Sequence, residues 1–338
     1  MNFVLAQSWL EKARNVLITT HVRPDGDAVG ALVALRNVLE HAARRAGRAC
    51  AVQPAFLSDV PEAYRFLLAE EPWLLPRQLS DEDVRAGALD RFDCIVVADT
   101  SALVQLPHVG DYLRSRGQGV MVIDHHLATD ELGQCRLVNP HASATGEIIF
   151  DLCRYAGWCL DPLTAAALFV AIATDTGWFR FENASSRAYE IGACLVAAGA
   201  QPAALHRRLF QSFPPARVRL LALALAGLEL HADDRVALLH ITRDMLARAG
   251  ADRGLIENIV NEPQQIASVA VVGLLVEQDD GGTRLSLRSR GQVDVNAVAA
   301  RFGGGGHAQA AGATLLEPLP AAREKLLAAL LAALPPKT

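Results

Sequence analysis

The chain has 338 residues, which is enough for two domains that each bury a core of their own. Hydrophobic residues make up 51% of the chain and charged residues 20%, a balance typical of a globular protein. The formal net charge of −5 excludes a global positive field that would attract DNA or a membrane surface. Any contact with nucleic acid must therefore come from a local cluster of residues.

Targeting and redox features favour a cytoplasmic protein without a membrane segment. Polar residues such as Gln7, Glu11 and Lys12 interrupt the apolar start of the chain, which argues against a secretory signal. The most apolar internal run, residues 163–173, is far shorter than the roughly 20 residues that cross a bilayer. The six cysteines form no C-x-x-C pair and most have apolar neighbours, so we expect reduced core thiols.

Predicted helices and strands alternate in the first part of the chain. We expect helices at residues 3–14 and 28–45, and strands at 15–20, 49–56, 92–98 and 119–123. Residues 57–91, which contain Pro61, Pro72 and Pro76, predict short helices and loops. The runs at 92–98 and 119–123 are apolar throughout, which is typical of strands buried on both faces. This pattern predicts an α/β domain whose mainly parallel sheet is flanked by helices.

Acidic residues and histidines follow three of these strands. They are His21, Asp25 and Asp27 after the first strand, Asp99 after residues 92–98, and Asp124, His125 and His126 around the end of the strand at 119–123. Because the carboxyl ends of parallel strands share one edge of a sheet, we expect these side chains to meet. Taken alone, the turn at residues 24–27 could be merely solvated, with Asp27 capping the next helix. A calcium loop would need further oxygen ligands that are missing.

Two further helices follow a short strand predicted at residues 137–141. The first spans about 143–155, with Ser143 or Thr145 as its cap. The second begins at Asp161-Pro162 and ends at Asp175. A carboxylate at the C-terminus of a buried helix opposes the helix dipole, so a positive group such as a metal ion should compensate it. The alternative is that Asp175 only starts a turn.

The second half of the chain predicts helices first and then a smaller α+β domain. The expected helices are 187–198, 202–210 and 217–230, with Ser185 and Ser186 as caps and a linker at Pro214-Pro215. Strands are expected at 236–241, 267–277, 284–289 and 313–316, and helices at 295–301 and up to about 333. We therefore divide the chain into a first domain (1–190), a helical linker (191–232) and a smaller second domain (233–338).

The first domain offers six candidate metal ligands: His21, Asp25, Asp27, Asp99, His125 and Asp175. Carboxylates and imidazoles without a thiolate favour Mn²⁺, Mg²⁺, Fe²⁺ or Co²⁺ over a structural zinc ion. Six ligands suit two ions about 3.5–4 Å apart, which would activate a bridging hydroxide for attack on phosphorus. His126 could then contact the phosphate or protonate the leaving oxygen, and Asp124 could orient a histidine ring.

These segments resemble the motifs of the DHH phosphoesterase superfamily. The resemblance lies in His21-x-x-Pro-Asp25-Gly-Asp27, Asp99, Asp124-His125-His126 and Thr174-Asp175-Thr176-Gly177, and in a tail, residues 302–312, similar to the DHH-associated C-terminal domain. It implies one ion, Mn²⁺ above all, held by His21, Asp25 and Asp99. It implies a second ion held by Asp27, Asp99, His125 and Asp175, with His126 and Asp124 as catalytic residues.

The tail contains a candidate substrate site. The run Gly303–Gly306 offers backbone N–H groups that could wrap an anion, although it could also be a flexible loop. The resemblance assigns substrate contacts to Arg288, Ser289, Gly304, Gly305, Gly306 and His307. Nearby arginines could instead form a solvated strand face. Residues 253–258 depart from the family pattern, which leaves the substrate preference open.

The resemblance is greatest with the nanoRNase/pAp-phosphatase branch of the superfamily. It implies hydrolysis of short oligoribonucleotides (nanoRNA) to mononucleotides, or of 3′-phosphoadenosine 5′-phosphate (pAp) to AMP. The alternatives are a cyclic-di-AMP or pApA phosphodiesterase and, from another class, a nucleotide-binding regulator without turnover. We expect the protein to bind neither long duplex nucleic acid nor a membrane. We expect it to be a monomer or a homodimer. The direction of digestion, the physiological metal and the oligomeric state stay open.

Overall fold

The computed structural model describes residues 1–69, 77–127 and 130–336, so the expected loop positions Pro72 and Pro76 lie outside the described residues. The chain divides into two units, Met1–Ser212 and Phe213–Thr338. Our three-part division, with a separate helical linker at 191–232, stays a prediction. None of the helices in the described ranges has both the length and the apolar character of a membrane span.

The first unit is built on a six-stranded parallel sheet in the order β3-β2-β1-β4-β5-β6. Its strands are β1 (Asn15–Thr19), β2 (Ala51–Phe56), β3 (Arg77–Gln78), β4 (Cys94–Ala98), β5 (Val120–Asp124) and β6 (Cys135–Val138). The order reverses between β1 and β4. In such sheets, ligands bind at the carboxyl ends of the strands at this switch point.

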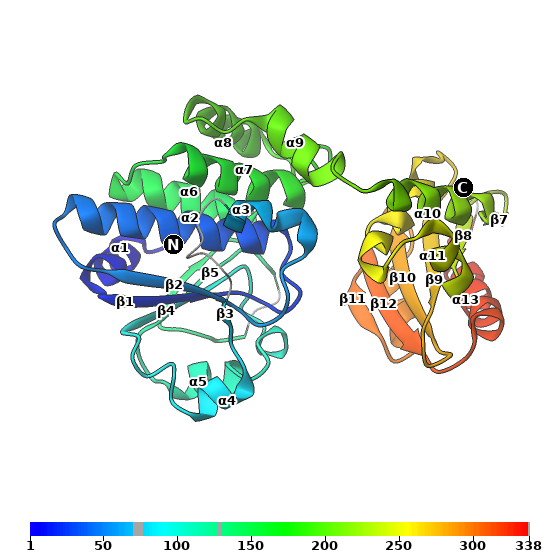
Figure 1. The fold of residues 1–338 in the computed structure, drawn as a ribbon, viewed down its shortest axis with the longest axis horizontal. Helices are drawn as coiled ribbons and strands as arrows, with labels where there is room; N and C mark the ends of the chain where they lie inside the picture. The colour runs from blue at the N-terminus through cyan, green and yellow to red at the C-terminus, as the bar shows by residue number, and fades with distance from the viewer. Residues whose placement is uncertain (70–76, 128–129, 337–338) are drawn as a thin grey trace. The chain divides into compact units, whose positions relative to one another are not determined.

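Helices cover both faces of this sheet (Figure 1). The unit contains α1 (Phe3–Lys12), α2 (Gly26–Arg45), α3 (Phe66–Ala69), α4 (Asp81–Arg85), α5 (Gly110–Ser115), α6 (Thr145–Ala156), α7 (Pro162–Asp175), α8 (Ser186–Ala197) and α9 (Pro202–Phe210), with short 3₁₀ turns at Glu62–Tyr64 and Leu103–Gln105. Helices α2, α6 and α7 lie on one face, and α4 and α5 on the other. Gly30 lets α2 approach α7 closely, because a Cβ there would lie 2.4 Å from the Ala167 carbonyl oxygen.

The second unit contains a mixed six-stranded sheet in the order β11-β12-β10-β9-β8-β7, in which only β8 and β9 are parallel. Its strands are β7 (Glu229–His231), β8 (Val236–Ile241), β9 (Val271–Glu277), β10 (Thr283–Ser289), β11 (Gly305–His307) and β12 (Ala310–Leu315). Its helices are α10 (Pro215–Ala226), α11 (Arg243–Ala249), η4 (Arg253–Ile256), η5 (Ile259–Gln265), α12 (Val295–Ala300) and α13 (Leu319–Ala333). Two apolar clusters, one on each face, form its core.

The predicted fold class is confirmed, and several local predictions are wrong. Helix α10 ends at Ala226, because Gly227 follows it and the next residues pair as β7. The end of the glycine run belongs to strand β11, which was not expected, so the alternative of a flexible loop is wrong for Gly305 and Gly306. Ser185 caps α8 as expected, but Ser186 is already the first helical residue. Helix α6 has Ala144 at its N-cap with no side-chain cap, because other groups bind the hydroxyls of the two residues that we expected to cap it.

Candidate active site

The carboxyl ends of β1, β4 and β5 and the ends of α2 and α7 converge on one site. Three overlapping groups of side chains have ligand atoms within 4.8 Å of one another: His21, Asp25 and Asp99; Asp27, His125 and Asp175; and Asp99, His125 and His126. The structure thus brings together all six candidate metal ligands and His126. The shared members Asp99 and His125 make this one continuous cluster.

Asp25 and Asp27 reach the cluster because α2 begins between them. Asp25 is the N-cap of α2, and its Oδ1 accepts hydrogen bonds from the N–H groups of Asp27 and Ala28, both at 3.1 Å. The alternative in which Asp27 itself caps α2 is therefore wrong. Asp27 lies in the first turn and is 1% exposed.

The buried carboxylate of Asp27 is held by the N-terminus of α6. Its Oδ2 accepts the N–H of Thr145 at 2.6 Å, and its Oδ1 accepts the N–H of Gly146 at 2.9 Å. The first N–H groups of a helix have no partner within the helix, and they carry a partial positive charge. Asp27 thus supplies the partner that a capping side chain would otherwise give.

Asp99 lies between His21 and His125. Its Oδ2 is 3.5 Å from Nε2 of His21, and its Oδ1 is 3.7 Å from Nε2 of His125. Its backbone is in the left-handed region, with φ of 64°. Such a conformation is unfavourable for a residue with a side chain, and it is typical of positions where function fixes the geometry.

The two adjacent histidines have different surroundings. His125 Nδ1 is 3.3 Å from the Ala142 carbonyl oxygen, and its Nε2 is 3.4 Å from Asp175 Oδ2. His126 Nδ1 is 2.8 Å from Asp124 Oδ1, while the Ser101 hydroxyl donates to Asp124 Oδ2. Burial lowers the pKa of His125, whereas the hydrogen bond with Asp124 raises the pKa of His126.

Mutual repulsion and burial destabilise the ionised carboxylates of the cluster. Burial, followed by the charges of neighbouring aspartates, raises the pKa of Asp27 and Asp99 well above the ordinary value. Burial and the charge of Asp25 raise the pKa of Asp175 to about 7. Within the described ranges, no Lys or Arg forms an ion pair with these three carboxylates. A divalent cation would supply the missing positive charge, so the donor set fits metal ions.

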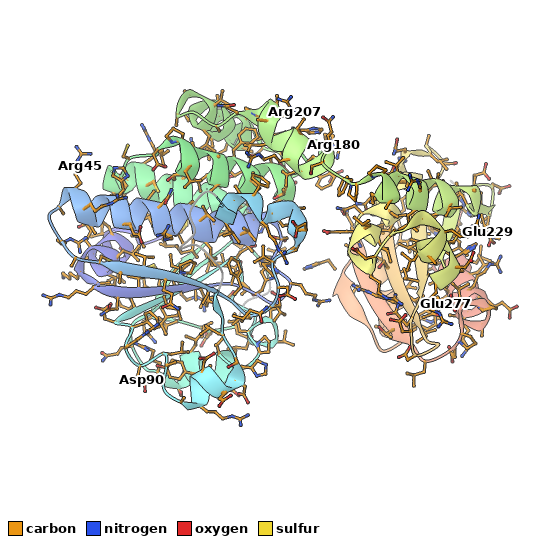
Figure 2. All side chains as sticks on the ribbon, in the orientation of Figure 1. Arg45, Asp90, Arg180, Arg207, Glu229 and Glu277 are labelled. Carbon is orange, nitrogen blue, oxygen red and sulfur yellow. The ribbon has the colours of Figure 1, made fainter. Side chains whose placement is uncertain are left out.

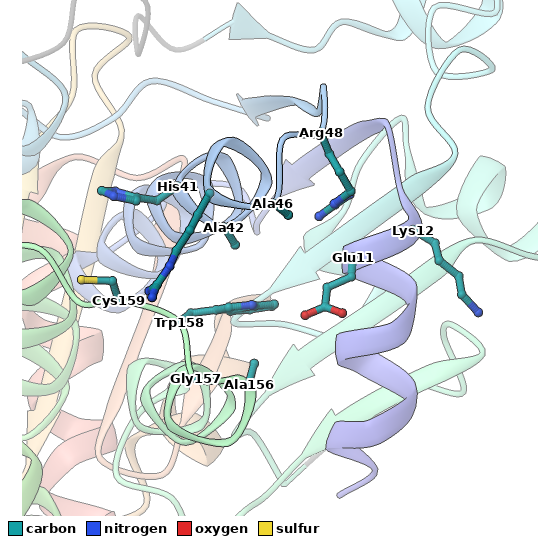
Figure 3. Close-up of a pocket in the computed structure, with 11 residues that line it drawn as sticks. Glu11, Lys12, His41, Ala42, Ala46, Arg48, Ala156, Gly157, Trp158 and Cys159 are labelled. Carbon is teal, nitrogen blue, oxygen red and sulfur yellow. The ribbon is translucent and has the colours of Figure 1, made fainter.

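A cavity of about 600 Å³ lies elsewhere on the first unit, where α1, α2 and α6 end (Figure 3). Helix α2 has 20 residues, so its C-terminal end is about 30 Å from Asp25. Lys12, Arg45 and Arg48 line the cavity beside Trp158, and Figure 2 shows Arg45 at this end of α2. Three helix C-termini carry partial negative charge there, which these cations offset. We assign the cations this structural role and no ligand.

The predicted substrate residues of the second unit divide between the two faces of its sheet. In the strand register, His307 pairs with Ala310 and Ala310 with Arg288, which puts His307 and Arg288 on one face about 10 Å apart. Ser286, two residues before Arg288 in β10, lies on this face too, and it was not among the predicted substrate residues. Ser289 lies on the opposite, buried face, where its hydroxyl accepts the N–H groups of Gly291 and Val293.

Two glycines of the run, Gly304 and Gly306, are required by close packing against β12. A Cβ at Gly304 would lie 2.1 Å from the Gly312 carbonyl oxygen, and one at Gly306 would lie 2.4 Å from that of Ala310. Gly306 also has a φ of 150°. The Arg288 side chain donates to the Leu287 carbonyl, and burial lowers its pKa.

Several residues that support the cluster were missed from the sequence. They are Ser101, Gly146 and Asn183, whose amide donates to the backbone carbonyls of Asp175 and Ser143. Thr145 was identified only as a helix cap. No residue pattern marks these roles, because backbone N–H and C=O groups form most of the contacts. The only signal was the position of residues 143–147 at the start of a predicted helix.

Comparisons with known proteins agree with this geometry. The model of the DHH family N-terminal domain matches residues 15–174, and that of the DHHA1 domain matches residues 235–334. The bifunctional oligoribonuclease and PAP phosphatase NrnA of Thermus thermophilus is 31% identical over 89% of this chain and 84% of that protein. The cyclic-di-AMP phosphodiesterase GdpP of Geobacillus thermodenitrificans is 26% identical over 90% of this chain but only 45% of that protein.

The fold has a solved counterpart as well. The crystal structure of an exopolyphosphatase-related protein from Bacteroides fragilis superposes with a TM-score of 0.89 at 25% identity, over 98% of this chain and 96% of that one. The order of the two matched domains, their coverage of both units and the 31% identical relative agree with one another. The chain therefore belongs to the DHH family and carries a DHHA1 domain after its DHH domain.

Proposed function

We propose that this chain hydrolyses short oligoribonucleotides to mononucleotides and converts pAp to AMP. It is a hydrolase of phosphoester bonds by its family. The observation that carries the reaction class is the cluster of four carboxylates and two imidazoles at the sheet's switch point. The substrate class rests on the name of the Thermus relative, which this chain matches over both domains.

Two divalent cations fit the cluster. One would be held by His21, Asp25 and Asp99, and the other by Asp27, Asp99, His125 and Asp175. The oxygen-rich donor set without thiolate favours Mn²⁺, with Mg²⁺ and Co²⁺ as alternatives. When bound, such ions supply Lewis acidity, which activates water and neutralises charge on the phosphate.

The side chains beside these ligands suit proton transfer and phosphate binding. The pKa of Asp124 is lowered, despite its burial, by hydrogen bonds from His126 and Ser101, so it stays ionised and accepts the Nδ1 proton of His126. We propose that this bond holds His126 protonated and orients it toward the phosphate. There its Nε2 proton can pass to the leaving oxygen.

The second unit would bind the nucleotide away from the bond that is cut. Arg288, Gly304, Gly305, Gly306 and His307 offer a guanidinium, backbone N–H groups and an imidazole on or beside one sheet face. These groups suit a phosphate or a base edge. For Ser289 we propose a positioning role, since its hydroxyl is bonded to the loop that follows β10.

We also propose a cellular location and an oligomeric state for this protein. All six cysteines are free thiols, which supports a reducing, cytoplasmic location. We propose a monomer or homodimer that acts on small substrates and not on long duplex nucleic acid.

A comparison of initial rates tests the substrate class. The substrates are a five-nucleotide RNA, pAp, pApA and cyclic-di-AMP, each with Mn²⁺, Mg²⁺ or Co²⁺. We expect the RNA and pAp to be hydrolysed fastest. A preference for cyclic-di-AMP or pApA would favour the second candidate, which the Geobacillus relative supports. Binding of nucleotides without hydrolysis of any of them would favour the regulator, although no expected ligand is missing.

A further inference from the structure

Thr145, the first residue of α6, contacts two of the proposed metal-binding carboxylates at once. Its N–H donates to Asp27 Oδ2 at 2.6 Å, and its hydroxyl donates to Asp99 Oδ1 at 2.9 Å. The side chain is fully buried. These two carboxylates come from different elements, α2 and the end of β4, so Thr145 fixes their positions relative to each other.

The two oxygens that Thr145 binds face the same side of the cluster. Asp99 Oδ1 is 3.7 Å from His125 Nε2, and Asp27 Oδ2 is 3.9 Å from the same atom. The other oxygen of Asp99, Oδ2, faces His21 at 3.5 Å and receives no bond from Thr145. The contacts of Thr145 are therefore confined to the His125 side.

We propose that Thr145 is a positioning residue for one of the two proposed cation sites, the one formed by Asp27, Asp99, His125 and Asp175. This inference rests on the proposed function. The hydroxyl fixes the rotation of the Asp99 carboxylate, so that Oδ1 points toward His125 while Oδ2 serves the His21 side. Partners of this kind orient a ligand before the ion arrives, and their loss typically weakens metal binding about 10- to 100-fold.

The chain offers a matched control in Thr164. This threonine is also buried near the N-terminus of a helix, α7, and its N–H also donates to an aspartate, Asp161, at 2.8 Å. Its hydroxyl, however, has no hydrogen-bond partner. Thr164→Val therefore removes a buried hydroxyl without removing a carboxylate contact.

The test is calorimetric titration of Mn²⁺ into the full-length protein after chelator treatment. The wild type and Thr164→Val should bind two ions. Thr145→Val should bind one ion as tightly as the wild type and the other about 10- to 100-fold more weakly. Thr145→Ser, which keeps the donor, should restore the second ion. If Thr145→Val does not fold, Thr145→Ala carries the same expectation.

Each outcome separates this inference from the proposed function. A wild type that binds no divalent ion would overturn the two-ion proposal itself. Two ions bound by Thr145→Val with wild-type affinities would overturn the role of Thr145 alone. Equal weakening of both ions, or failure of Thr145→Ser to restore binding, would also overturn it, because a general structural role predicts both.

Discussion

Removal of divalent ions should make the stability of this protein fall as the pH rises. The reason is the cluster of Asp27, Asp99 and Asp175, whose pKa values are all raised in the folded protein. A carboxyl with a raised pKa binds its proton more tightly when folded than when unfolded. Stability is therefore lost as the pH rises from the unfolded pKa to the folded one.

The magnitude follows from Asp175, whose pKa is raised from 3.8 to about 7. Within that window each pH unit costs about 1.4 kcal/mol, so a rise from about pH 5.5 to pH 8 removes about 2 kcal/mol. Asp27 and Asp99 act in the same direction. His126 also acts in this direction, because its raised pKa means that the folded state gains stability from it only at lower pH. His125 acts in the opposite direction, because its pKa is lowered in the folded protein.

Urea unfolding of the chelator-treated protein at about pH 5.5 and about pH 8 measures this effect. Added Mn²⁺ should reverse the loss, because an ion that binds only the folded state adds about 2.7 kcal/mol at a hundred times its Kd. Asp175→Asn is the control variant. It removes one repelling charge, so its metal-free stability should depend less on pH by about 2 kcal/mol.

Two results would refute this reasoning. The first is a metal-free protein that is as stable at about pH 8 as at about pH 5.5. The second is an Asp175→Asn variant with the full pH dependence of the wild type. Either result would mean that these carboxyls do not keep their protons in the folded state, and the need for a compensating cation would then have no electrostatic basis.

His126→Ala should lower kcat about 10²- to 10⁴-fold, the usual contribution of a general acid, and a steady-state assay that finds kcat unchanged would contradict that role. Arg288→Ala should raise KM for pAp about tenfold or more, the scale of a hydrogen bond to a charged group. Arg284→Ala, exposed on the same strand face, should leave KM unchanged, and equal effects would refute a specific contact. Gly304→Ala should destabilise the second unit by about 1–3 kcal/mol in thermal unfolding, whereas Gly305→Ala, with 3.8 Å to the nearest atom, should be tolerated.

The candidate metal-binding cluster was predictable because parallel strands impose a simple rule. Residues that follow such strands meet at one edge, so His21, Asp99 and His125 could be grouped without knowing any distance. The apolar runs of β4 and β5 marked the buried strands themselves. Asp175 was foreseen through its unfavourable position at a helix C-terminus.

The support of the cluster was not predictable, because it depends on contacts that leave no trace in side-chain type. Thr145 is a residue type that often caps helices, yet its hydroxyl donates to Asp99. The N-cap residue of α6 is Ala144, which provides no side-chain cap. The β11 strand was missed because glycine has low strand propensity, and its pairing with β12 is a tertiary effect. Ser289 was assigned to the substrate, but the register of β10 turns it into the core.

The amides of Thr145 and Gly146 can report on the folding of this protein, because both donate to a distant residue. Their hydrogen-bond acceptor, Asp27, lies more than a hundred residues earlier in the chain. Helix α6 can thus form early from local contacts, but its first two amides gain protection against hydrogen exchange only when α2 docks beside it. These two amide protons therefore report on the moment at which Asp27, on α2, reaches the N-terminus of α6.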